Sequence, residues 1–146
     1  MKQIKIAIDP GKTGALAVRY PEGTVDVFKY KSEADMRDSL AEIKRYASTE
    51  KYRLSAVLEK VRSSPQQGVT SAFTFGWNYG FWRGLLQAYR ISFREVRPQD
   101  WQKGLVPAKK QKGERKHALK QIAEERFPEL KVTLATADAL LMLDNA

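Results

Sequence analysis

Apolar and polar residues alternate along the first part of the chain. Over residues 3–9, isoleucine occupies every second position, which is the period of a β-strand. A Pro-Gly turn leads into a second apolar run at 14–18, and a turn at 21–23 leads into a third at 25–28. This pattern predicts a three-stranded antiparallel meander.

A change of period marks the first helix. Met36, Leu40, Ile43 and Ala47 recur at intervals of four, three and four residues, so a helix places them on one face. Ser32 precedes them and is a candidate N-cap. The apolar run that follows, at 54–58, predicts a buried strand.

The rest of the chain predicts one further strand and three helices. The expected elements are a strand at 91–96 and helices at 69–89, 116–127 and 136–145. Between them, 97–104 has the composition of an irregular turn and 106–113 that of a basic loop. Pro128 stops one helix, and either Thr133 or Thr136 is available to cap the last.

This order of elements predicts an α/β fold in which helices flank a mixed, five-stranded sheet. The chain has 146 residues and 42% apolar composition, which is enough material for a single compact domain spanning 1–146.

Three glycines spaced by four, Gly76, Gly80 and Gly84, form one smooth stripe on the long helix. Each costs helix stability, by about 1 kcal/mol relative to alanine, so their register indicates close approach by another backbone. Two explanations stay open: the stripe packs against the sheet of the same chain, or it forms a homodimer interface.

Charge narrows the class of partner. The chain has 26 Lys and Arg against 17 Asp and Glu, a net charge of +9, which favours a polyanion. A membrane surface would be served by the same excess, but no amphipathic basic anchor helix is evident, so nucleic acid is the favoured partner. Neither a secretory signal nor a run of about 20 apolar residues is present, so we expect a cytoplasmic protein without membrane spans.

The absence of cysteine excludes thiolate zinc sites and thiol nucleophiles, and the lone His117 cannot supply a multi-histidine site. Any metal must therefore bind oxygen ligands. Asp9 and Glu59 each end an apolar strand, and Asp138 is expected in the first turn of the last helix, where the helix dipole favours it. If the two strands are parallel neighbours, their carboxylates meet at one edge, which predicts a magnesium site.

The motifs around these acids resemble those of RuvC-type Holliday junction resolvases. They are Ile-Asp-Pro-Gly-Lys-Thr-Gly-Ala-Leu-Ala from Ile8, Val-Leu-Glu-Lys from Val57 and Ala-Asp-Ala-Leu-Leu from Ala137, in family order over nearly the whole chain. Val-Arg-Pro from Val96, with Trp101, and a lysine-rich stretch before a helix ending in Phe-Pro resemble phage members of this group.

The resemblance implies a ribonuclease H-like fold and a homodimer that straddles a four-way DNA junction. It also implies two Mg²⁺ or Mn²⁺ ions in each active site, which support phosphodiester hydrolysis leaving a 5′ phosphate. Asp9 would bridge both ions, and Glu59 and Asp138 would complete individual shells. A lysine near the scissile phosphate, Lys112 or Lys116, is the candidate for stabilising transition-state charge; the catalytic set we favour includes Lys116.

One acid of the family pattern is missing. The family places a fourth acid three or four residues before the last Asp, where this chain has Ala135 and Leu134. Asp144 is no replacement, because six residues along a helix is about 240° of rotation, and Glu129 would need an unusual loop. The chain is therefore an inactive variant, an enzyme whose shell is completed by water or a distant acid, or a junction binder without nuclease activity. We hypothesise that the active form carries an acid at 135.

Basic and polar side chains beside these motifs are candidates for binding DNA. They are Lys12, Arg62, Gln66, Gln67, Lys109, Lys110, Lys112, Arg115 and Lys116. Phe73 or Phe75 could insert between unstacked bases, although core packing is the favoured role of both.

Two other functions remain as alternatives to the resolvase. The first is another ribonuclease H-like nuclease acting on RNA–DNA hybrid or RNA, because Asp-x-Gly followed by Thr-Gly also opens those families. The second is a non-catalytic junction-binding protein, which fits the basic surface and the missing acid. An actin-like ATPase is excluded, since the chain lacks its second glycine-rich phosphate loop.

Overall fold

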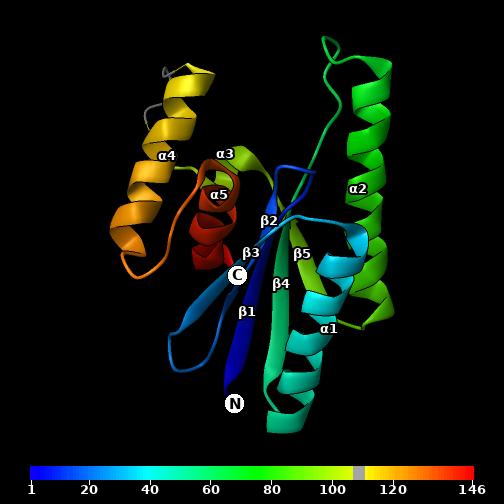
Figure 1. The fold of residues 1–146 in the computed structure, drawn as a ribbon, viewed down its shortest axis with the longest axis vertical. Helices are drawn as coiled ribbons and strands as arrows, with labels where there is room; N and C mark the ends of the chain where they lie inside the picture. Colours follow the sequence, from blue (N-terminus) through cyan, green and yellow to red (C-terminus); the bar gives the residue numbers. More distant parts are fainter. Residues whose placement is uncertain (107–110) are drawn as a thin grey trace.

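The computed structural model describes residues 1–106 and 111–146, without the side chain of Lys112. Its core is a five-stranded sheet in the order β3-β2-β1-β4-β5 (Figure 1). The strands are β1 (Gln3–Asp9), β2 (Ala15–Arg19), β3 (Val25–Lys29), β4 (Arg53–Glu59) and β5 (Ser92–Val96). β1, β2 and β3 pair antiparallel, whereas β4 pairs parallel with both β1 and β5. The predicted meander and mixed sheet are confirmed.

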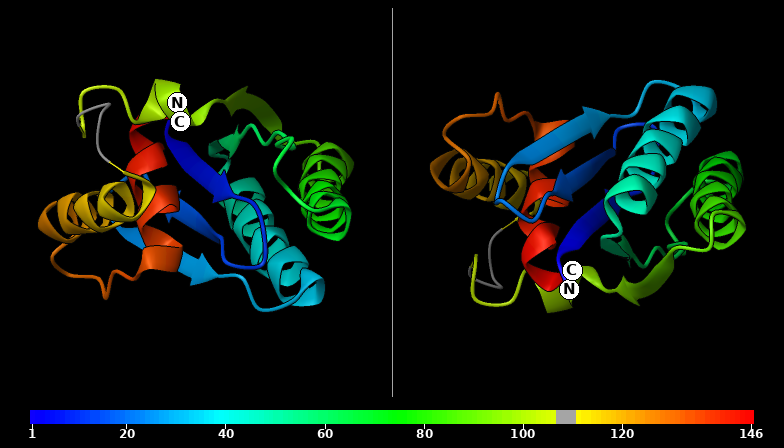
Figure 2. Two further views of the ribbon diagram at one scale, coloured as in Figure 1. Left: turned by 90° about the horizontal axis from the view of Figure 1, so that it is seen from above. Right: turned by 90° about the horizontal axis from the view of Figure 1, so that it is seen from below.

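Helices cover both faces of this sheet (Figures 1 and 2). On one face, α1 (Glu33–Glu50) and α2 (Val69–Ala88) pack against the large side chains of β1, such as Ile4, Ile6 and Ile8. On the other face, α4 (Lys112–Arg126) and α5 (Leu134–Met142) share a core with the small residues Ala7 and Ala17. Small side chains on that face let α5 approach the strands closely.

The first helix follows its sequence pattern. Met36, Leu40, Ile43 and Ala47 are all buried, and the Ser32 side chain accepts a hydrogen bond from the Asp35 backbone N–H at 3.1 Å. The N-cap predicted from the sequence is thus confirmed, and the periodic face is the one that packs on the sheet.

Three boundaries in the second half differ from the prediction. Residues expected to form an irregular turn contain the short helix α3 (Pro98–Trp101), which begins with proline at its first turn and carries an Arg97–Asp100 ion pair at 2.9 Å. Proline at that position has no N–H to leave unpaired, so it favours a helix start. Helix α4 begins at Lys112 rather than Lys116, inside the stretch predicted as a loop.

The last helix also starts earlier than expected. Thr133 is the N-cap of α5, and its side chain and that of Thr136 form a reciprocal capping box. A 3-10 turn, η1 (Leu143–Asn145), follows it. Because the cap is Thr133, Asp138 lies in the second turn of the helix, not the first. The expectation that the helix dipole stabilises Asp138 is therefore wrong.

The glycine stripe of α2 is uncovered in the part of the chain that the structure describes. A side-chain carbon added at Gly76, Gly80 or Gly84 would meet no described atom within 4 Å outside the helix's own backbone, which contradicts packing of the stripe against the sheet. Phe73 and Trp77 on the same helix are 67% and 63% exposed. The expected core role of Phe73 is therefore wrong, and α2 presents an open apolar surface.

Candidate functional site

Asp9 and Glu59 end neighbouring parallel strands in matching register. The pairing of β1 with β4 runs to Ile8 opposite Leu58, so the two acids follow side by side at the same edge of the sheet. Asp138 comes from α5, which packs across β1 and β2. All three side chains are half-buried. The condition set by the sequence, that the two strands be neighbours, is met.

The acids influence one another electrostatically. Burial raises the pKa of Asp9 well above its ordinary value, and the carboxylates of Glu59 and Asp138 raise it further, while Lys116 opposes them. Burial likewise raises the pKa of Glu59 to about 7, against a hydrogen bond from Trp101 that lowers it. The pKa of Asp138 is raised by burial and lowered by Lys116. A cluster of acids with raised pKa values binds protons or cations more readily than isolated acids do.

Trp101 forms a hydrogen bond with Glu59. Its indole Nε1 donates to Glu59 Oε2 at 2.6 Å, and the ring is only 3% exposed, in the core between the sheet and α4. The sequence indicated Trp101 only through its place in a family motif and gave no sign of this contact. Helix α3, which the sequence did not predict, brings the indole to the end of β4.

Asn78 forms a hydrogen bond with the turn that follows Asp9. Its Oδ1 accepts a hydrogen bond from the Gly11 backbone N–H at 2.6 Å, although 67 residues separate them. Asn78 is a buried polar residue on α2, and buried amides need such partners. In the same turn, a side-chain carbon at Gly14 would lie 1.9 Å from the Asp9 carbonyl oxygen, so only glycine fits. The sequence signal for Asn78 is a polar residue within an apolar helix.

Ala135, at the position of the missing acid, has lysines around it. It lines a pocket of about 520 Å³ with Lys29, Lys116 and Lys120. Asp144 is paired with Arg126 at 2.7 Å and Arg19 at 3.4 Å, so it points away, as its helical rotation predicted. Glu129 is exposed in the turn before α5. No nearby acid of the described chain takes the place of the missing one.

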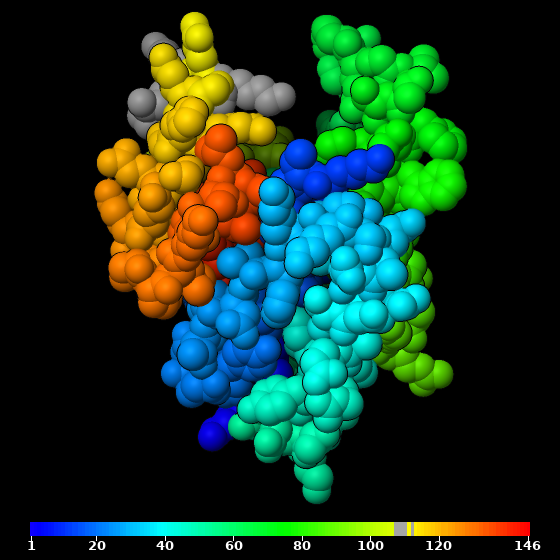
Figure 3. Space-filling model, in the orientation of Figure 1, coloured from blue at the N-terminus to red at the C-terminus, as the bar shows by residue number. Residues whose placement is uncertain are grey.

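Most of the predicted DNA-binding residues lie in two segments that extend beyond the end of the sheet where Asp9 and Glu59 lie. The loop with Arg62, Gln66 and Gln67 leads into the free end of α2, and the start of α4 rises on the other side; the surface is hollowed between them (Figure 3). Lys12 is exposed in the turn between them, in a small pocket shared with Phe75. Arg115 is half-buried and donates to Gln102 Oε1 at 3.0 Å. Lys109 and Lys110 lie outside the described residues.

The described residues form neither a ready-made metal site nor a membrane-spanning helix. Within 1–106 and 111–146, no three histidine, cysteine, aspartate or glutamate side chains have the arrangement of a metal site. The carboxylate chemistry nevertheless fits a hard cation, since Asp9 and Glu59 hold raised pKa values that a bound ion would lower. In the same part of the chain, no helix combines the length and apolar character needed to cross a membrane.

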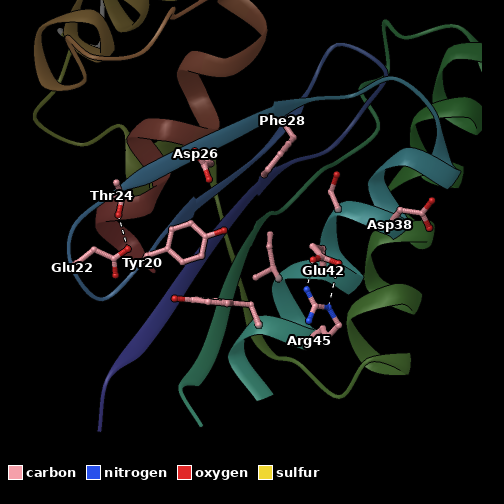
Figure 4. A pocket seen from close by; sticks show the side chains of 11 residues that line it. Tyr20, Glu22, Thr24, Asp26, Phe28, Asp38, Glu42 and Arg45 are labelled. Carbon is pink, nitrogen blue, oxygen red and sulfur yellow. Dashed lines mark hydrogen bonds and ion pairs between the residues drawn. The ribbon is translucent and has the colours of Figure 1, made fainter. Parts of the chain in front are cut away.

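A larger pocket lies away from these acids. It measures about 700 Å³ between the β2–β3 hairpin and α1, and it contains Glu22, Asp26, Asp38 and Glu42 with Tyr20 and Tyr46 (Figure 4). None of the predicted site residues lines it, and its acidic character is the opposite of what a nucleic-acid site needs.

Comparison with known proteins gives the fold. No protein-family model and no curated protein sequence matches the chain. Among solved structures, Thermus thermophilus RuvC matches 96% of this chain over 90% of its own length, with a TM-score of 0.55 and 15% sequence identity. T. thermophilus RuvC in complex with a Holliday junction substrate matches 97% of this chain over 90% of its own, with a TM-score of 0.57 and 13% identity. The chain therefore has the ribonuclease H-like fold of RuvC, as the sequence predicted.

Proposed function

We propose that this protein is a structure-selective endonuclease that cuts four-way DNA junctions. The observation that carries the proposal is the pairing of Asp9 and Glu59 at the ends of parallel β1 and β4, with Asp138 acting on the same charge cluster. A net charge of +9 supports a polyanionic substrate. The likeness to a RuvC structure with a Holliday junction supports branched DNA as the substrate class.

In this proposal, Asp9, Glu59 and Asp138 would hold divalent ions, Mg²⁺ or Mn²⁺, two in each active site. Bound ions would supply charge neutralisation and activation of water for an in-line displacement at phosphorus. Attack by water breaks the bond from phosphorus to the 3′ oxygen and leaves a 3′ hydroxyl and a 5′ phosphate. Lys116, whose charge already acts on Asp9 and Asp138, stabilises negative charge on the scissile phosphate.

The alanine at 135 bears on whether this chain cuts or only binds. We propose that an active form carries an acid at 135, one helical turn from Asp138. Restoring it with Ala135→Asp should increase Mg²⁺-dependent cleavage of a synthetic four-way junction, with Ala135→Asn as the uncharged control. If neither variant gains activity, the lost-acid hypothesis is wrong. Tight junction binding by every form, with no cleavage in Mn²⁺, favours the non-catalytic binding protein.

We also propose a homodimer formed through α2. The stripe of Gly76, Gly80 and Gly84 faces open space, and the exposed aromatic rings of Phe73 and Trp77 lie on the same helix. Large exposed apolar surfaces are typical of protein interfaces. A two-fold dimer would present two carboxylate clusters to one junction, as symmetric cleavage of two strands requires.

Substrate preference distinguishes a junction-cutting enzyme from other ribonuclease H-like nucleases. Cleavage rates on a four-way junction, an RNA–DNA hybrid and a linear duplex of equal length should favour the junction, in either Mg²⁺ or Mn²⁺. A tenfold preference for the hybrid would replace the resolvase proposal with that of another ribonuclease H-like nuclease.

A further inference from the structure

A pocket lined with lysine lies beside the carboxylate cluster. It measures about 520 Å³, and its charged lining residues are Lys29 at the end of β3 and Lys116 and Lys120 on α4. Thr13, from the turn after β1, adds a hydroxyl, and Val132, Thr133, Leu134 and Ala135 complete the lining. No acidic side chain is among these described lining residues. Three lysines from two elements therefore line one pocket.

The charges in this pocket are only partly neutralised. Lys120 pairs with Glu124 at 3.2 Å on the surface of α4, where a pair four residues apart contributes little. Lys116 acts on Asp9 and Asp138, lowering the pKa of each against the effect of burial. Lys116 thus belongs to both places, and an anion in the pocket would lie next to the carboxylate cluster.

The small side chain at 135 keeps this pocket open. Ala135 is half-buried and contributes only a methyl group to the lining. A carboxylate at this position would stand among the three lysines and compete with any external anion for them. The same residue that the sequence marks as a missing metal ligand thus lines a pocket whose charged residues are all lysines.

We propose that this lysine pocket binds a backbone phosphate of the DNA strand, next to the phosphate that is cut. This inference rests on the proposed junction-cutting function and extends it by a subsite made from Lys29, Lys120 and Thr13. Lys29 and Lys120 hold the neighbouring phosphate, and Lys116 faces both it and the scissile one. Lysine is suited to this role because it binds phosphate as a compact charge without needing a fixed geometry.

The test is the salt dependence of junction binding by the whole chain in EDTA. Each neutralised phosphate contributes about 0.9 to the slope of log K against log salt, so the double variant Lys29→Gln/Lys120→Gln, which loses the one neighbouring phosphate, should reduce the slope by about one. Each single variant should reduce it by part of that amount. Lys2→Gln is the matched control, because Lys2 is exposed at the opposite end of β1. It removes the same charge and should change the slope less than either pocket variant.

Substitutions at position 135 give a second test of the phosphate subsite, independent of the lysine variants. Ala135→Asp should weaken metal-free junction binding and reduce the salt slope, whereas Ala135→Asn should leave both near the wild-type values. Equal slopes for Lys29→Gln, Lys120→Gln and Lys2→Gln would overturn the phosphate subsite while leaving the junction-cutting function intact. A wild-type chain that binds linear duplex as tightly as a junction would instead contradict the proposed function. Thermal unfolding of each variant verifies that it is folded.

Discussion

The indole Nε1 of Trp101 donates a hydrogen bond of 2.6 Å to Oε2 of Glu59, so a buried side chain of α3 contacts the acid at the end of β4. The contact holds one of the two carboxylate oxygens of Glu59. Partners of this kind orient metal-binding carboxylates and are known to affect metal affinity.

Replacing Trp101 with phenylalanine should therefore weaken cation binding. The change removes the N–H donor and keeps an aromatic ring, so we expect roughly tenfold weaker Mn²⁺ affinity, measured by titration calorimetry. Trp77→Phe is the control, because Trp77 is exposed on α2. Equal Mn²⁺ affinities in the wild type and Trp101→Phe would show that the hydrogen bond does not position Glu59 for the ion.

Asn78 ties α2 to the turn that follows Asp9, so its loss should destabilise that turn. Asn78→Ala leaves the Gly11 N–H without its acceptor in a buried place, which costs about 1–3 kcal/mol of unfolding free energy. Urea denaturation measures this, with Gln87→Ala on the exposed surface of the same helix as control. A change as small as that of the control would mean that the turn finds another partner.

The stability of the metal-free protein should fall as pH rises from about 4.5 to about 7. The pKa of Glu59 is raised by burial from 4.5 to about 7, so the folded state holds a proton that the unfolded state has released. The stabilisation is complete below the unfolded pKa and is lost as pH passes the folded one. The pKa values of Asp9 and Asp138 are raised by burial too, and they act in the same direction.

Urea unfolding in EDTA at pH 5 and pH 7.5 measures this effect. Glu59→Gln should flatten the pH dependence, since glutamine does not titrate, and Mg²⁺ should restore stability at the higher pH by binding the folded state. An unfolding free energy that rises over this interval would contradict the raised pKa values.

The open surface of α2 should support self-association. Gly80→Glu places a charge where nothing lies within 4 Å in the single chain, so the monomer should still fold while a dimer would be disrupted. Sedimentation equilibrium of the wild type, of this variant and of Ala34→Glu, on the exposed start of α1, measures the association. A wild type that stays monomeric at high concentration would exclude the α2 dimer.

Periodicity predicted most of the fold, because the features it depends on are local. The alternation of Ile4, Ile6 and Ile8 and the spacing of Met36 and Leu40 each report which side is buried, and the structure agrees. The start of α5 was missed by two residues, because either threonine fits a cap and only the reciprocal Thr133–Thr136 contacts select one.

The candidate site was predictable only in part. Strand ends and family motifs selected Asp9, Glu59 and Asp138, whose roles as metal ligands stay predictions. The contacts of Trp101 and Asn78 cross 42 and 67 residues, and no local pattern reports such distances. The lysine pocket at Ala135 likewise brings together residues of β3, α4 and α5 that lie far apart in the sequence.

The most direct test of the central claim is anomalous diffraction from crystals grown with Mn²⁺. We predict Mn²⁺ peaks in contact with the carboxylates of Asp9, Glu59 and Asp138, at the shared end of β1 and β4, and loss of those peaks in Asp9→Asn. An ordered structure at saturating Mn²⁺ with no peak at these three side chains would contradict the metal-dependent nuclease proposed for this fold.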